Sequence, residues 1–105
     1  MPEHDHGGQP YQVQGSGVIA QALRQIQRRA AREGRGEEVL SAFRHIAHQL
    51  QHDPGNLGEP LYRLPALRMQ IRSVAIRPLV VDFGVCEDRP VVLLRAVKLL
   101  SARES

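Results

Sequence analysis

The chain of 105 residues contains no tryptophan and only four other aromatic residues, two Tyr and two Phe. Leucine, valine, isoleucine and alanine must therefore supply the core, and a chain of this length supports one domain with one modest core. Cys86 is the sole cysteine, which excludes an intramolecular disulfide and fits a reducing compartment.

Long apolar runs are missing as well. No run reaches the roughly 18 residues that a membrane-spanning helix needs. The first residues are polar and lack the apolar segment of an export signal. We therefore expect no membrane partner and a cytoplasmic location.

Lysine is nearly absent from a basic chain. The net charge is +3, and 13 of the 14 basic residues are arginine. Between residues 61 and 105, eight basic residues stand against four acidic ones, which suits an anionic partner. Arginine makes bidentate phosphate contacts that lysine does not make. A GC-rich genome that favours arginine codons explains the same bias.

The first half of the chain predicts a helical pair. Residues 1–10 are polar and rich in Gly and Pro, so we expect a disordered tail before a single domain over 11–105. Tyr11–Gln14 alternates apolar and polar residues, a weak strand signal. Two amphipathic helices should follow within 17–51, with Ser16 as the first N-cap and Gly34 at the turn between them.

Each helix has an apolar stripe at helical spacing. The stripes are Val18, Ile19, Ala22, Leu23, Ile26 and Ala30 in the first helix, and Val39, Leu40, Phe43, Ile46, Ala47 and Leu50 in the second. Arg24, Arg28 and Arg32 lie opposite the first stripe, so we expect them to be exposed.

Three strand-like runs follow a Pro/Gly-rich connector at 53–60. They cover 67–76, 79–87 and 90–99, are rich in β-branched residues, and are separated by turn residues. The predicted fold class is α+β, with the order β-α-α-β-β-β. A helical hairpin should pack on one face of a four-stranded, mainly antiparallel sheet.

Alternation along the first of these runs points to a basic sheet face. Arg68, Gln70 and Arg72 alternate with Met69, Ile71 and Ser73, and successive side chains of a strand point to opposite faces. We expect the arginine face to be free and the other face to pack against the helices. A basic free face suits a phosphate backbone. Ordinary alternation, with some arginines paired to Asp82 or Glu87, explains the same pattern.

Other kinds of site have little support. The Gly-Ser-Gly at 15–17 lacks the lysine and spacing of a phosphate-binding loop. His45, His48 and His52 share one strip of the second helix, which suits a metal or pH-sensing site, but a solvated helix face is the favoured reading. Two further histidines lie in the tail. We predict no metal site and no cofactor.

The order of elements and four short segments resemble the RelE/ParE superfamily of bacterial type II toxins. The segments are LQHDP at 50–54, LGEPL at 57–61, LR at 67–68 and PLVVDFGV at 78–85. The resemblance implies a toxin that either cuts mRNA on the ribosome or poisons DNA gyrase. It also implies an antitoxin partner, and a homodimer is a further possibility.

The resemblance also suggests site residues. Arg68 matches a basic residue at the start of the second strand, and Lys98 falls near a basic position after the last one. Arg72, Arg77 and Arg95 are candidates by proximity. Arg68, Arg72 and Arg95 are thus the catalytic candidates, and all five residues are candidates for binding nucleic acid or another anion.

The end of the chain departs from the RNA-cleaving members, which carry a Tyr or His near the C-terminus. Residues 99–105 contain neither, and the nearest tyrosine, Tyr62, lies between the predicted helices and the first predicted strand run. A ribosome-dependent endoribonuclease is therefore the expected activity only if the protein is an enzyme. The alternative is a non-toxic orphan binding protein that shares the fold and lacks catalysis.

Overall fold

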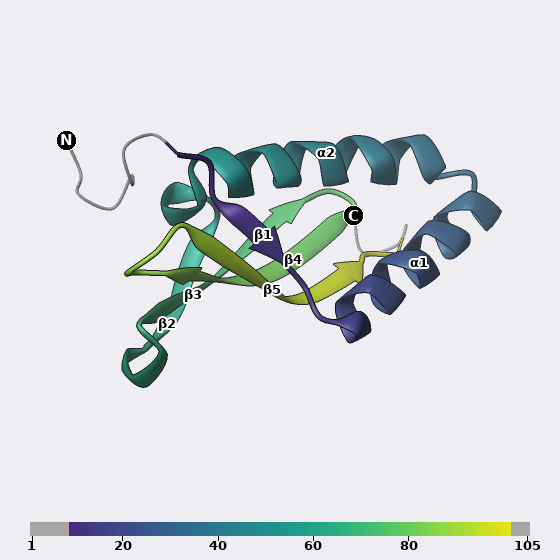
Figure 1. The fold of residues 1–105 in the computed structure, drawn as a ribbon. Coiled ribbons are helices and arrows are strands. Elements are labelled where there is room, and N and C mark those ends of the chain that lie inside the picture. The colour runs from purple at the N-terminus through teal and green to yellow at the C-terminus, as the bar shows by residue number, and fades with distance from the viewer. Residues whose placement is uncertain (1–8, 102–105) are drawn as a thin grey trace.

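A five-stranded mixed sheet carries two helices on one of its faces (Figure 1). This computed structural model describes residues 9–101, so residues 1–8 of the predicted tail lie outside it. The elements are β1 (Gln12–Gln14), α1 (Gly17–Arg32), α2 (Gly36–His52), β2 (Glu59–Leu64), β3 (Met69–Ile76), β4 (Leu79–Cys86) and β5 (Val91–Leu99), with short 3-10 turns at Pro54–Asn56 and Pro65–Leu67. The α+β class and the helical pair are confirmed.

Local sequence signals set the ends of the helices. The Ser16 hydroxyl accepts a hydrogen bond from the backbone N–H of Ile19 at 3.4 Å and caps α1. Gly34 follows the end of α1 with φ +71°, a left-handed conformation that glycine adopts without a steric penalty. Glu37 and Glu38 stand in the first turn of α2, where the helix dipole favours acidic side chains.

The helices cover the sheet from one side. In Figure 1, α2 runs along the sheet. The helix before it, α1, lies at an angle to α2 and extends from the start of α2 toward β5. The core between the layers includes Ile26, Ala30, Val39, Ala42, Ile46, Leu50, Val74, Leu79, Val81, Phe83, Val92 and Leu99. Val18 and Leu40 were expected in the apolar stripes, but they are 78% and 38% exposed, so those two predictions are wrong.

The sheet has five strands, because the predicted connector continues into a strand. Its order is β1-β5-β4-β3-β2, with β1 parallel to β5 and the other pairs antiparallel. The added strand, β2, lies at the sheet edge, and five of its six residues are exposed. A bulge between Pro60 and Tyr62 interrupts its pairing with β3. An exposed edge strand with a bulge has no apolar alternation to reveal it in the sequence.

The alternation in β3 is confirmed, but the faces are reversed. Val74 and Ile76 pair with Val81 and Leu79 on the helix side, and period two then places Arg72 on that side too. Met69 and Ile71 instead lie on the face away from the helices. There they form a second buried cluster with Cys86, beside Leu64, Val91 and Leu93.

Glycine is required where this second cluster crosses β4. Gly84 pairs with Ile71, and the Met69 side chain lies directly over its Cα. A Cβ at Gly84 would overlap the thioether of Met69.

Among the described residues, no helix is both long and apolar enough to cross a membrane.

Candidate anion-binding surface

Arg72 is a buried structural residue, which corrects its predicted place on a free face. It is 7% exposed and faces the helices. Its Nε donates to the carbonyl of Leu57 at 2.9 Å, Nη2 donates to the carbonyl of Gly58 at 3.2 Å, and Nη1 donates to Oε1 of Gln70 at 2.8 Å. The guanidinium therefore fastens the segment after α2 to β3, and no carboxylate is among these partners.

Arg68 and Arg77 stand at opposite ends of β3. Arg68 precedes the strand with φ 49°, and Arg77 follows it in the turn to β4. Nine residue steps along a strand separate their Cα atoms by roughly 30 Å. Both residues are exposed. One ligand the size of a nucleotide cannot touch both side chains.

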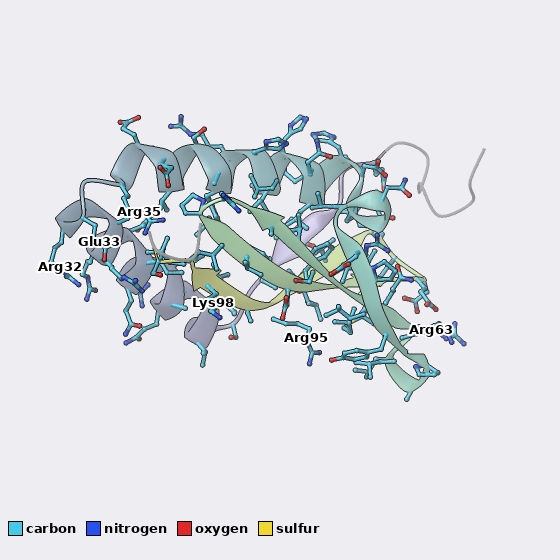
Figure 2. All side chains as sticks on the ribbon, turned by 180° about the vertical axis from the view of Figure 1, so that it is seen from behind. Arg32, Glu33, Arg35, Arg63, Arg95 and Lys98 are labelled. Carbon is cyan, nitrogen blue, oxygen red and sulfur yellow. The ribbon has the colours of Figure 1, made fainter. Side chains whose placement is uncertain are left out.

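Arg95 lies on the helix-free face, and Lys98 lies where that face borders α1, beside Ala22, Gln25 and Arg29. Both are exposed residues of β5. Lys98 pairs with Val80, whose side chain points away from the helices, and Arg95 is the extra residue of a bulge beside Asp82. Figure 2 shows Arg95 projecting from the side of the sheet opposite α2. The β3–β4 turn that carries Arg77 lies beside the end of β5, because Leu100 N–H donates to the Pro78 carbonyl at 2.8 Å.

The five predicted cations thus separate into three groups. Arg95 and Lys98 occupy exposed positions of β5, which we call the β5 basic surface, and Arg77 stands in the β3–β4 turn at its end. Arg68 stands at the far end of the sheet, and Arg72 is withdrawn into the core. The structure places two of the five anion-binding candidates on this surface and a third at its end, and of the three catalytic candidates only Arg95 lies on it.

Glu87 is predicted as a partner for some arginines, and the structure pairs it with Arg63, which sequence reasoning did not single out. Nε and Nη2 of Arg63 donate to the two carboxylate oxygens at 2.6 and 2.7 Å. These hydrogen bonds lower the pKa of Glu87, and Arg68 adds a smaller electrostatic contribution in the same direction. The 24 positions between the partners leave no sequence signal, since only the pairing of β2 with β3 brings Arg63 to the end of β4.

Charged groups on the helices stay in solvent. Arg24, Arg28 and Arg32 are exposed, as the helical register predicts. The neighbouring acid, Glu33, instead pairs with Arg29 and Arg35, and the hydrogen bond from Arg29, then that from Arg35, lowers its pKa.

The histidine strip is also exposed. The ring centroids of His48 and His52 lie 4.5 Å apart. Within residues 9–101, no group of three His, Cys, Asp or Glu side chains is placed to hold a metal ion.

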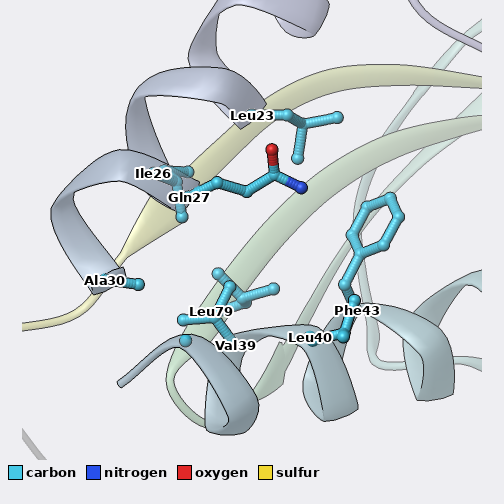
Figure 3. A pocket seen from close by; sticks show the side chains of 9 residues that line it. Leu23, Ile26, Gln27, Ala30, Val39, Leu40, Phe43 and Leu79 are labelled. Atoms are coloured by element: carbon cyan, nitrogen blue, oxygen red, sulfur yellow. The ribbon is translucent and has the colours of Figure 1, made fainter. Parts of the chain in front are cut away.

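An apolar cleft opens where the two helices diverge (Figure 3). It has a volume of about 210 Å³ and is lined mainly by Leu23, Ile26, Val39, Leu40, Phe43 and Leu79. Gln27 supplies the only polar side chain of the lining. The cleft therefore suits an apolar side chain of a partner and offers no group for chemistry.

The chain matches no protein-family model, no curated protein and no solved structure. Its functional interpretation depends on the placement of the side chains described above.

Replacing Arg72 should affect stability and leave the β5 basic surface intact. Arg72→Ala leaves two backbone carbonyls and the amide oxygen of Gln70 without their hydrogen-bond donor. We therefore expect a loss of roughly 2–4 kcal/mol in the free energy of unfolding. Arg95→Ala, the matched exposed control, should change it by less than about 0.5 kcal/mol. Urea unfolding measures both. Equal stability of the two variants would contradict the structural role of Arg72.

The Arg63–Glu87 pair should stabilise the protein only while Glu87 is ionised. Its folded pKa lies below the ordinary 4.5, so the stabilisation is complete above that value and disappears as the pH falls through the folded pKa. Wild type should therefore melt slightly above Arg63→Gln at pH 7, and the gap should close in acid and in high salt. A gap that widens in acid would contradict this account.

Proposed function

We propose that the protein is a toxin-like member of the RelE/ParE superfamily that binds RNA of the translation machinery through the β5 basic surface. It would belong to a type II toxin–antitoxin system in the bacterial cytoplasm. The observation that supports this most strongly is a sheet with helices on one face only, whose other face exposes Arg95 and Lys98. The β-α-α-β-β-β order of the resemblance is present, with β2 added at the edge.

The charges of the β5 basic surface are available to a ligand. Within the described part of the chain, Arg95, Lys98 and Arg77 make no ion pair, whereas Arg29, Arg35 and Arg63 do. Unpaired cations on a helix-free sheet attract phosphates and release counterions when they bind. An open sheet face suits an extended single strand better than a duplex.

A binding role is better supported than RNA cleavage. Cleavage requires cations around the scissile phosphate together with a group that moves a proton. Arg72 is buried and Arg68 lies at the other end of the sheet, so two of the three catalytic candidates are away from Arg95. The non-toxic orphan binding protein is therefore the second candidate function, and the burial of Arg72 is the observation that favours it.

The antitoxin remains part of the proposal. An antitoxin would act by covering the β5 basic surface or by holding the protein away from its target. The apolar cleft between α1 and α2 provides an attachment point for such a partner on the far side of the sheet. A DNA gyrase target would require the same basic surface to recognise a protein in place of RNA.

Induced expression in bacteria tests the proposal. Wild type should arrest growth and reduce incorporation of labelled amino acids before DNA synthesis declines. Arg95→Gln/Lys98→Gln should relieve the arrest at equal protein levels. Arg24→Gln/Arg28→Gln removes the same charge from α1 and should not relieve it.

Three results would count against this function. Earlier loss of DNA synthesis would point to gyrase. Growth without arrest, with RNA binding retained in vitro, would favour the orphan binding protein. Equal relief by both double variants would show that net charge, and not the β5 basic surface, is responsible.

A further inference from the structure

A second cleft lies at the opposite end of the sheet from the helical cleft, on the helix side. Its volume is about 380 Å³, and its walls come from the start of β1, the turn after α2, and the ends of β3 and β4. Tyr11 and Val85 are buried apolar walls, while Asn56, Gln70 and Glu87 contribute polar groups. A cleft of this size is large enough for a small organic ligand.

Gln70 has a fixed orientation in this cleft. Its Oε1 accepts the hydrogen bond from the buried Arg72 at 2.8 Å, so its amide nitrogen points away from Arg72. The positive charge of Arg72 has no carboxylate among its hydrogen-bond partners, and it polarises the amide toward stronger donation. The Gln70 N–H donor in the lining of the cleft is therefore turned away from Arg72 and supported by a buried cation.

Glu87 supplies an acceptor on the same side. Gln70 pairs with Val85, and Glu87 N–H donates to the Arg68 carbonyl at 2.8 Å, which extends the ladder by one pair. Glu87 is thus the diagonal neighbour of Gln70, with Cβ atoms roughly 7–8 Å apart. Arg63 holds the carboxylate ionised and fixed, and each oxygen keeps a lone pair for a further donor.

We propose that this cleft binds a lactam nucleobase, guanine or uracil, with Gln70 donating to the ring carbonyl and Glu87 accepting from the adjacent ring N–H. The assignment rests on the proposed RNA-binding function and adds base selectivity to it. Tyr11 and Val85 would contact the faces of the ring. Arg68, whose positive charge lies close enough to Glu87 to stabilise its carboxylate, would contact the phosphate attached to the base.

The same geometry disfavours the other two bases. Adenine and cytosine place an exocyclic amino group where guanine and uracil have the carbonyl, so two donors would meet at Gln70. They also lack the ring N–H from which Glu87 would accept a hydrogen bond. Guanine offers a second donor, its 2-amino group, which gives it an advantage over uracil at a carboxylate.

Calorimetric titration of the full chain with 5′-GMP, UMP, AMP and CMP tests the assignment. GMP should bind at least about tenfold more tightly than AMP, and UMP more tightly than CMP. Gln70→Glu keeps an acceptor for Arg72 and removes the donor, so it should weaken GMP binding by at least about tenfold without lowering the melting temperature. Arg24→Gln on α1 is the matched control and should bind GMP like wild type.

Equal affinities for the four nucleotides, undetectable binding of all four, or unchanged GMP binding by Gln70→Glu would overturn the assignment. An unlabelled RNA oligomer titrated in parallel separates the two proposals. If the oligomer binds and the mononucleotides show no selectivity, the cleft assignment fails and the RNA-binding function stands. If neither binds, both fail.

Discussion

The buried guanidinium of Arg72 is the interaction on which the arrangement of this protein depends. It donates hydrogen bonds to the two consecutive carbonyls of Leu57 and Gly58. These bonds fix the direction of the chain as it leaves α2. Gly58 has φ +67°, and a Cβ there would overlap the Ser73 carbonyl, so the segment lies directly on β3. From this point the chain runs along β3 as the fifth strand, β2. A buried cation is costly, and the three oxygens around it offset that cost.

The position of β2 has two consequences for function. It brings Arg63 to Glu87, which removes one cation from the set that could bind a ligand, while Arg72 is removed by burial. The turn that leads from α2 toward β2 also forms one wall of the polar cleft, beside the sheet. Among the remaining exposed cations, the course of β5 sets the positions of Arg95 and Lys98.

Local patterns predict most of the fold. The two helices, Ser16, Gly34 and the β4–β5 hairpin follow from periodicity and turn residues. The orientation of β3 does not, because Met69 and Ile71 are apolar on one face and Val74 and Ile76 on the other. The pairing of Val74 with Val81 decides it, a contact that a single strand's pattern cannot show. Gln70 is only two positions from Arg72. The other hydrogen-bond partners of Arg72 and Arg63 lie 14 to 24 positions away in the sequence, so tertiary structure sets those contacts too.

The central claim is that the helix-free face of β5 binds single-stranded RNA. Backbone amide NMR shifts of the isotope-labelled protein, recorded during titration with a short single-stranded RNA, test it residue by residue. With an oligoadenylate, whose base the cleft at Gln70 and Glu87 disfavours, the account predicts shift changes concentrated at residues 80–82 and 94–99 that weaken steeply with added salt. Changes confined to α1 and α2, or no changes at low salt, would contradict it.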